Sequence, residues 1–262
     1  MSAMTQSTWF KPMRRASLVL PAAALLACLA AVVTGSAVPG WTATARPVAA
    51  DGSARAGAPL AGRIKPKVTY RGLATFYAAG KGDGSCMFGP ARNMMVAAMN
   101  TTDFENAKAC GAFIRVTSGG RSITVKVTNS CPTCQARQLD LSAQAFAKLA
   151  APVKGRIAIK WRLLSPKTSL KVSVRYKSGS SRYWCGIQVL DHRNPIAALH
   201  VRTSKGWRKL TRTAYNYFLS PKGAGCGKAI SATDIYGQKL TFTGVKLRPN
   251  VIQRTRFQFS RH

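Results

Sequence analysis

Carboxylates are the scarcest reactive side chains in this sequence, so the place of each one is informative. The chain has 262 residues, with 40 Lys and Arg against seven Asp and Glu. The seven acids are Asp51, Asp83, Asp103, Glu105, Asp140, Asp191 and Asp234. Enzymes that cleave glycosidic bonds generally use two carboxylates, one as acid and the other as base or nucleophile. A chain with so few acids can supply such a pair at few places.

Asp140 is the acid whose position should be fixed by regular secondary structure. Every second residue of 122–128 is apolar, which predicts a half-buried strand. A turn over 130–135 follows, and a short helix is predicted over 143–150, for which Ser142 is a good N-cap. Two interpretations stand for Asp140 at this junction. It is either a functional carboxylate or an acceptor for the backbone amides of a local turn.

Two domains of different character follow a linker. Residues 46–68 are rich in Ala, Gly, Pro, Lys and Arg without periodicity, which is typical of a flexible basic linker. Residues 69–164 predict a β-rich domain with short helices, one of them over 102–108. Residues 168–262 predict about seven or eight short strands, which is typical of a small antiparallel β-sandwich.

The first 45 residues have the features of a secretory signal peptide. Basic residues precede an apolar run over 16–37, and small residues suit cleavage after Ala37 or Ala45. An uncleaved membrane anchor and lipidation at Cys28 are the alternatives. The sequence therefore predicts a secreted, extracellular protein.

The formal net charge of +33 indicates a polyanionic partner. Export makes nucleic acid an unsuitable partner and favours cell-wall polymers such as pectin, teichoic acid or peptidoglycan. We therefore expect no nucleic-acid binding, and an affinity for the wall that falls with added salt.

Six cysteines lie beyond the predicted signal peptide. They are Cys86, Cys110, Cys131, Cys134, Cys185 and Cys226. An even number in an exported chain predicts disulfides, of which fifteen pairings are conceivable. Cys131 and Cys134 have the spacing of metal ligands, but no second such pair exists and the histidines are remote, so we expect no metal and no cofactor.

Aromatic residues concentrate in the second domain, where their flat faces suit stacking on sugar rings. If Ile187 and Val189 face the core of a strand, Trp184 faces outward and Tyr183 falls on the core side, unless the strand begins with a splayed or bulged residue. Trp207 fits either side. Most aromatics in a sandwich belong to its core, which is the alternative for each of them.

Several motifs occur in the order found in one family. They are Gly72-Leu73-Ala74-Thr75-Phe76, V-x-V-T-N-x-C-P at 125–132, L-D-L-S-x-x-A-F at 139–146, I-K-W at 159–161, S-S-R-Y-W-C-G-I-Q-V at 180–189 and A-Y-N-Y-F at 214–218. Over residues 70–259 the chain resembles bacterial expansins. The resemblance implies a mainly β fold, a six-stranded double-psi β-barrel followed by an immunoglobulin-like β-sandwich that is a family 63 carbohydrate-binding module. The first domain by itself also resembles rare lipoprotein A, barwin-like proteins and family 45 endoglucanases.

The resemblance also implies roles for individual residues. Asp140 matches the essential aspartate of the family's glycan groove, and Thr75 matches a groove threonine. Tyr183, Trp184 and Tyr215 match an aromatic platform that stacks on cellulose, beside which Lys177 matches a lysine. The implied disulfides are Cys86–Cys110, Cys131–Cys134 and Cys185–Cys226.

Two departures from the family lie in the groove. Asn129 stands where bacterial expansins commonly have a second aspartate, and Cys131 stands where an aromatic residue often lines the groove. Asn cannot titrate, so the departure argues against acid–base hydrolysis. In the platform, Tyr183 replaces a tryptophan.

These observations predict a secreted, non-hydrolytic, monomeric expansin-like protein that binds cellulose and matrix polysaccharides and loosens plant cell walls. Pectin and peptidoglycan are further candidate partners. The alternative is a barrel enzyme of the lytic transglycosylase or endoglucanase type that cleaves peptidoglycan or cellulose. A protease-inhibitory module is a third hypothesis, which leaves the second domain unexplained.

Overall fold

The computed structural model describes residues 57–262. The predicted signal peptide, its cleavage sites and the alternatives at Cys28 lie outside the described residues. Among residues 57–262, no helix is both long and apolar enough to cross a bilayer.

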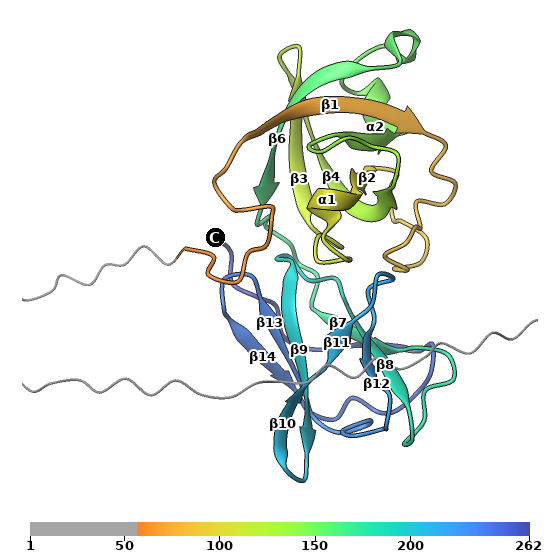
Figure 1. Ribbon diagram of the computed structural model, residues 1–262, viewed down its shortest axis with the longest axis vertical. Coiled ribbons are helices and arrows are strands. Elements are labelled where there is room, and N and C mark those ends of the chain that lie inside the picture. Colours follow the sequence, from red (N-terminus) through yellow and green to blue (C-terminus); the bar gives the residue numbers. More distant parts are fainter. Residues whose placement is uncertain (1–56) are drawn as a thin grey trace, which may run out of the picture. The chain divides into compact units, whose positions relative to one another are not determined.

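Six strands close into a barrel in the order β1-β5-β2-β4-β3-β6. They are β1 (Tyr70–Tyr77), β2 (Val96–Asn100), β3 (Phe113–Ser118), β4 (Arg121–Cys131), β5 (Leu139–Ser142) and β6 (Ile157–Leu164). The pairs β1–β5 and β2–β4 are parallel, and the other four pairs are antiparallel. This mixed barrel confirms the architecture expected for residues 69–164 (Figure 1).

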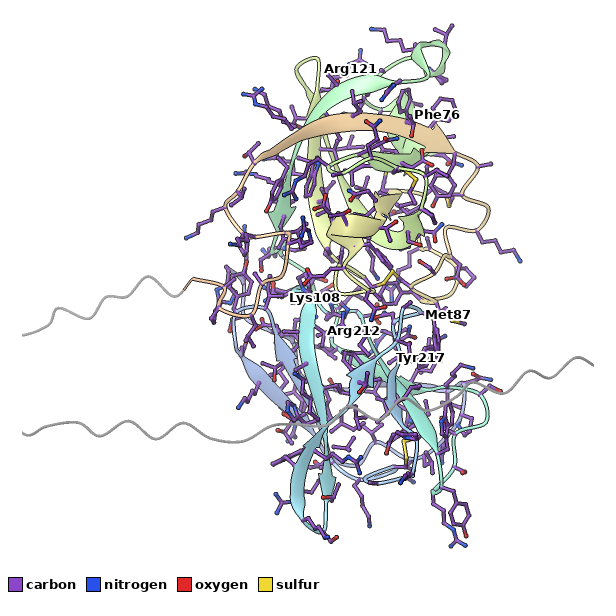
Figure 2. The ribbon with its side chains drawn as sticks, in the orientation of Figure 1. Phe76, Met87, Lys108, Arg121, Arg212 and Tyr217 are labelled. Atoms are coloured by element: carbon purple, nitrogen blue, oxygen red, sulfur yellow. A yellow bond between two sulfur atoms is a disulfide. The ribbon has the colours of Figure 1, made fainter. Side chains whose placement is uncertain are left out.

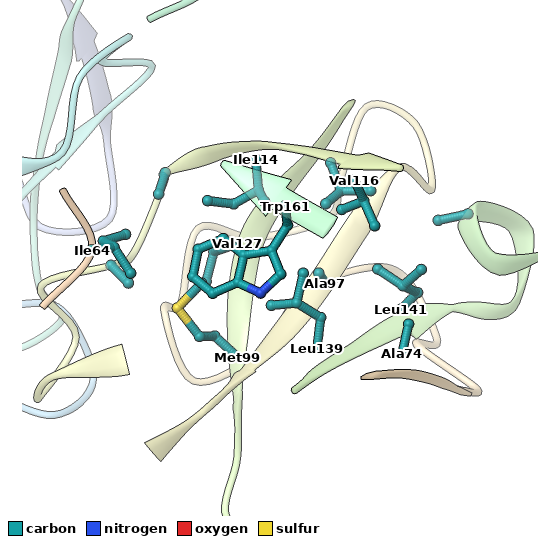
Figure 3. Packing of buried hydrophobic residues seen from close by; sticks show 14 of the residues in the cluster. Ile64, Ala74, Ala97, Met99, Ile114, Val116, Val127, Leu139, Leu141 and Trp161 are labelled. Carbon is teal, nitrogen blue, oxygen red and sulfur yellow. The ribbon is translucent and has the colours of Figure 1, made fainter. Parts of the chain in front are cut away.

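The barrel interior is filled by alternate residues of its strands, around the indole of Trp161 (Figure 3). The Trp161 side chain is 1% exposed, and its Nε1–H donates to the carbonyl oxygen of Arg137 at 2.9 Å. Ala74 and Leu139 also point inward, together with Leu141. Because side chains alternate along a strand, the residues between and beside these apolar ones face outward from the barrel.

Two short helices flank the strands. α2 (Ala143–Ala147) is capped as predicted, since the Ser142 hydroxyl accepts from the Ala145 amide at 3.1 Å. The prediction of a helix over 102–108 is wrong, because α1 (Thr101–Phe104) is a single turn capped by Asn100. The next three residues, 105–107, all have positive φ, and a right-handed helix cannot continue through them.

Two further sheets form a sandwich. One has the order β10-β9-β13-β14 and the other the order β11-β12-β8-β7-β15. The strands are β7 (Ser173–Tyr176), β8 (Cys185–Leu190), β9 (Ile196–Thr203), β10 (Gly206–Lys209), β11 (Thr211–Arg212), β12 (Phe218–Ser220), β13 (Ile230–Asp234), β14 (Lys239–Phe242) and β15 (Ile252–Arg254). Val174 and Ile187 of one sheet and Val201 and Ile230 of the other share a single buried core. The shared core confirms the predicted β-sandwich.

The described part of the predicted linker packs against the fold. Ile64 is buried in the barrel core, and the Leu60 amide donates to the carbonyl oxygen of Ile235 in the sandwich at 3.1 Å. The amide of Arg63 donates to a Glu105 carboxylate oxygen at 2.7 Å. Residues 57–68 are therefore not a free linker, and ordered structure begins before the predicted start of the barrel domain at residue 69.

Three disulfides link Cys86 to Cys110, Cys131 to Cys134 and Cys185 to Cys226. These are the pairs that the family resemblance implies. The first two lie in the barrel and the third lies in the sandwich.

The barrel loop at Cys86–Met87 is held by the sandwich. The Gln188 amide nitrogen donates to the Cys86 carbonyl oxygen at 2.8 Å, and Arg175 donates to that of Met87. At a second contact, Arg212 donates to the Ala107 carbonyl oxygen at 2.7 Å (Figure 2). Gln188 faces outward from the sandwich core, but it is fully buried because the barrel covers it.

The imidazole of His192 completes this junction. A Cβ atom on Gly111 of the barrel would lie 2.4 Å from His192 Cε1, so only glycine fits there. Burial, assisted by the charges of Lys126 and Arg212, lowers the pKa of His192 to about 3, against the backbone hydrogen bond at Asn194 that raises it. The imidazole is therefore neutral across most of the pH range in which proteins function.

Candidate functional site

One outward-facing residue from each of four neighbouring strands forms a row across the barrel. Thr75 of β1 pairs with Asp140 of β5, Asp140 pairs with Ala98 of β2, and Ala98 pairs with Asn129 of β4. Paired residues in neighbouring strands share a face of the sheet. The sequence-predicted residues Thr75, Asp140 and Asn129 therefore lie along one surface, with only the methyl group of Ala98 between the last two.

Thr75 and Asp140 are directly bonded. The Thr75 hydroxyl donates to Asp140 Oδ1 at 2.6 Å, and the Gln138 side-chain amide donates to the same hydroxyl oxygen at 3.3 Å. Partial burial raises the pKa of Asp140 above its ordinary value, while the hydrogen bond from Thr75 opposes that rise. The second oxygen, Oδ2, makes no hydrogen bond with the described residues, so it is the atom that can accept from a hydroxyl group outside the protein.

The other three carboxylates of the barrel are engaged in holding the fold. Asp83 accepts from the backbone amides of Gly84 and Gly89, at 2.9 and 3.1 Å. Asp103 is 1% exposed and pairs with Arg137 at 2.5 Å. Glu105 accepts from the amide of Arg63 and pairs with a neighbouring lysine. Asp140 is thus the only carboxylate on the strands of the described barrel, whereas Asp83 is exposed in the β1–β2 connection.

Asn129 reaches this surface through a β-bulge. The register between β2 and β4 shifts at Ala97 and Ala98, so that Thr128 has no partner and is buried like Val127. Strict alternation would have turned Asn129 inward, and the extra residue turns it outward instead. The side-chain oxygen Oδ1 of Asn129 accepts from the backbone amides of Ser85 and Ser130 at 2.9 and 3.0 Å. Asn129 therefore anchors the β1–β2 connection at the end of the row.

Tyr77 is a member of this surface that the sequence analysis missed. It lies two residues after Thr75, so it faces the same side of β1. Its hydroxyl oxygen is buried beside the Asn129 side chain without meeting hydrogen-bond geometry. Burial raises the pKa of Tyr77, Asn129 opposes this, and the charge of Asp140 adds to it. The period-two spacing from Thr75 was the signal that could have identified it.

The aromatic candidates of the sandwich come from turns. Tyr183 lies in the turn that joins the bridge partners Ser181 and Trp184, before β8 begins at Cys185. Its side chain is 68% exposed, and the guanidinium of Arg182 lies 4.7 Å from its ring centroid. Because Tyr183 lies in this turn and not in the strand, its side chain is exposed and does not point into the core as strand alternation predicted.

Trp184 and Lys177 lie around Gly186 on the outer side of β8. Trp184 is half-buried and precedes Gly186 by two residues, so both face the same way. A Cβ on Gly186 would lie 3.2 Å from Lys177 Cβ and 3.4 Å from a ring carbon of Tyr217. The ring of Tyr217 is in turn 6.1 Å from that of Tyr215. Tyr217, which is 3% exposed, is therefore a buried neighbour of the half-buried candidate Tyr215.

Among residues 57–262, no three His, Cys, Asp or Glu side chains come close enough to hold a metal ion. The cysteine pair at 131 and 134 is oxidised at the end of β4, where it closes the turn that leads to β5.

Comparison with known proteins identifies the family of this chain. The family model described as "Lytic transglycolase" matches residues 69–161. Expansin-YoaJ of Bacillus subtilis is 32% identical over 184 residues, which cover 68% of this chain and 79% of that protein. The chain belongs to the expansin family.

Solved structures agree with this assignment across both regions. The expansin of Clavibacter michiganensis is 33% identical to this chain with a TM-score of 0.69, and the match covers 74% of this chain and all of that one. A mutant of the same expansin, in complex with cellohexaose, is 32% identical with the same TM-score. Because the match spans the barrel and the sandwich, the expansin fold accounts for both and for their order.

Proposed function

We propose that this chain is a secreted, non-hydrolytic expansin that binds cellulose through the sandwich and loosens plant cell walls through the barrel. The observation that carries the proposal is the outward row of the barrel, in which one hydrogen-bonded carboxylate stands without a second. Such a site can hold a glycan hydroxyl on Asp140, but the row has no second carboxylate for hydrolysis of the two-carboxylate type.

The sandwich supports cellulose as the bound polymer. Tyr183 is widely exposed, and Trp184 and Tyr215 are half-exposed on the same five-stranded sheet and its turns. Aromatic faces stack on the apolar faces of sugar rings, and the nearby Lys177 can bond ring hydroxyls. The solved complex of the Clavibacter michiganensis expansin mutant contains cellohexaose, a cellulose fragment, which supports the same ligand here.

The competing function is cleavage of peptidoglycan or cellulose by the barrel. The description of the matching family model, a lytic transglycolase, favours it for residues 69–161. Against it, the position opposite Asp140 is Asn129, whose side chain is already bonded to two backbone amides. A lytic enzyme with a single carboxylate would have to use Asp140 both to donate and to accept the proton.

The experiment measures mechanical extension and bond cleavage on the same samples. The full chain is added to isolated plant walls and to cellulose paper under constant load, and soluble reducing ends and anhydro-sugars are assayed in parallel. We expect extension of the walls without new sugar ends. Release of such ends from cellulose or peptidoglycan, lost on Asp140→Asn, would establish the enzyme instead.

Export and the monomeric state belong to the same proposal. Three disulfides suit an oxidising compartment. Sedimentation of the purified chain and fractionation of expressing cells test both, with a monomer in the medium as the expected result.

A further inference from the structure

The connection between β4 and β5 carries a disulfide that the proposed function does not use. Cys131 ends β4, and it is bonded to Cys134 three residues later. The amide of Cys134 also donates to the carbonyl oxygen of Cys131 at 3.2 Å. The next residues form a second tight turn, in which the amide of Gln138 donates to the carbonyl oxygen of Gln135 at 3.0 Å. Strand β5 with Asp140 follows directly, so the disulfide lies close in sequence to the barrel row.

The side chain of Gln138 joins this turn to the barrel row. Its Oε1 accepts from the backbone amide of Gln135 at 3.2 Å, and its Nε2 donates to Thr75 Oγ1 at 3.3 Å. The Thr75 hydroxyl uses its own proton to donate to Asp140 Oδ1 at 2.6 Å. Three hydrogen bonds therefore lead from the peptide group after Cys134 to the carboxylate, and each one polarises and orients the next.

The backbone of this turn is fixed at its β5 end by other contacts. The carbonyl oxygen of Gln138 accepts from the backbone amide of Asn100 at 3.4 Å and from its side chain at 3.1 Å. At the other end, the peptide group that supplies the Gln135 amide also contains the carbonyl carbon of Cys134, so the disulfide sets its orientation. Opening the disulfide should thus release the Gln138 side chain while strand β5 stays in place.

Of the three disulfides in the described residues, this one is the most suitable for cleavage in the folded chain. Cys86 and Cys110 are 0% and 1% exposed, whereas Cys134 is partly exposed and lies between two exposed residues. In the sandwich, Cys185 is 0% exposed although Cys226 is partly exposed. A disulfide that closes a short loop adds little to the stability of a fold, and this bond spans a sequence separation of 3, against 24 and 41 for the others. The chain can therefore lose it without unfolding.

We infer that Cys131–Cys134 is a redox-sensitive modification site, at which reduction by a soluble dithiol loosens the hydrogen bonds that Gln138 and Thr75 direct at Asp140. A thiolate of the dithiol attacks Cys134 Sγ, and Cys131 leaves as a thiolate that takes up a proton. The second thiol of the reagent then displaces Cys134 from the mixed disulfide. The dithiol is oxidised to a cyclic disulfide, and its two electrons and two protons end on the two cysteines.

The consequence for wall loosening rests on the function proposed above, but the hydrogen bonds can be followed without it. The bond from Thr75 lowers the pKa of Asp140 against the larger effect of burial. A Thr75 hydroxyl that no longer receives the Gln138 amide is a weaker and less well oriented donor, so reduction should raise the pKa of Asp140. That pKa is a property of the protein alone, and extension of plant walls is a second, separate readout.

The test treats the full chain with increasing dithiothreitol and alkylates the free cysteines, which mass spectrometry then locates. At the concentration where Cys131 and Cys134 are alkylated and the other two disulfides are intact, a carboxyl-carbon NMR titration measures Asp140 and wall extension is recorded under load. We expect these two cysteines to be reduced first, the pKa of Asp140 to rise, and extension to fall by about threefold. Reoxidation should restore both quantities.

Three variants separate the disulfide from the hydrogen bonds that depend on it. Cys131→Ala with Cys134→Ala removes the disulfide, so its Asp140 pKa should equal that of the reduced parent and should not respond to dithiothreitol. Gln138→Met retains the disulfide but lacks both side-chain hydrogen bonds, and it should show a raised pKa that does not respond either. Gln144→Met, the same change at an exposed position on α2, should behave as the parent chain does.

The outcomes distinguish this inference from the proposed function. A pKa of Asp140 that stays the same after selective reduction, or reduction of another disulfide before Cys131–Cys134, would overturn the inference. So would an active parent chain whose wall extension is equal before and after reduction. If the parent extends no wall but the pKa of Asp140 still rises on reduction, the hydrogen-bond pathway is supported and the proposed function fails.

Discussion

The barrel and the sandwich position their candidate ligand-binding residues in different ways. In the barrel, Thr75 and Asp140 lie on regular strands and are paired in register. In the sandwich, Tyr183 lies in a turn before its strand, and Tyr215 lies between β11 and β12. The strand register fixes a hydrogen bond of 2.6 Å between two side chains, whereas turns present broad aromatic faces to solvent. A site that grips one hydroxyl needs the first arrangement, and a site that holds a polymer surface is served by the second.

The junction between the two regions gives the largest expected effect, because it decides whether they act as one unit. The unfolded chain binds a proton at His192 near pH 6.5, whereas the folded chain does so only at about pH 3. Between these values the unfolded state takes up more protons, so stability falls as the pH falls. The loss approaches about 1.4 kcal/mol per pH unit.

Urea unfolding at several pH values checks this. His192→Gln should remove most of the acid slope, and His200→Gln, at a partly exposed site, should remove much less. If His192→Gln keeps the slope of the parent chain, protonation of His192 does not cause the loss of stability at low pH.

The next effect concerns the rigidity of the barrel row. Asp103 is buried, pairs with Arg137, and accepts from the Arg137 amide and from the side chain of Asn100 at 3.1 and 2.8 Å. Asp103→Asn leaves the arginine without its counter-charge, and Arg137 precedes the residue that bonds Thr75. We expect a loss of about 3 kcal/mol, since the arginine is one-third exposed and partly solvated. Urea unfolding measures it, and a loss below about 1 kcal/mol would show that the row does not depend on this pair.

Two tyrosines of the sandwich allow a buried aromatic residue to be compared with an exposed one. Tyr217 is 3% exposed, so Tyr217→Ala should cost about 3 kcal/mol of stability. Tyr183 is 68% exposed, so Tyr183→Ala should stay within about 0.5 kcal/mol of the parent while its retention on cellulose falls. Thermal unfolding and a cellulose pull-down separate the two quantities. Normal retention in Tyr183→Ala would remove this residue from the binding surface.

The smallest effect probes the hydrogen bond within the barrel row. The bond from Thr75 lowers the pKa of Asp140 against the larger effect of burial. Thr75→Val keeps the shape of the side chain and removes the donor, so the pKa of Asp140 should rise further. A carboxyl-carbon NMR titration detects the change, and Thr75→Ser, which retains the hydroxyl, is the control. An unchanged titration in Thr75→Val would mean that the bond is absent in solution.

Local patterns were sufficient to predict the placement of Asp140 and the cap at Ser142, because both depend on a few neighbouring residues. The bulge at Thr128 and the packing of Ile64 were not predictable in this way, since both depend on contacts with distant strands. Tyr183 also shows the limit of predicting side-chain orientation from local alternation. Alternation gave its side chain the wrong face because the strand begins two residues later. The proposed role of the barrel row came from its family motifs, whereas the outward position of Asn129 required the strand register.

The central claim is that the barrel loosens the wall through Asp140 while the sandwich does the binding. The most direct measurement is wall extension under load together with cellulose retention, for Asp140→Asn and for Tyr183→Ala. Asp140→Asn removes a carboxylate whose pKa is raised on folding. The fold should therefore be no less stable at neutral pH, and any loss of extension reflects function. We predict that Asp140→Asn abolishes extension with normal retention on cellulose, and that Tyr183→Ala loses retention. Extension by Asp140→Asn equal to that of the parent chain would contradict the account.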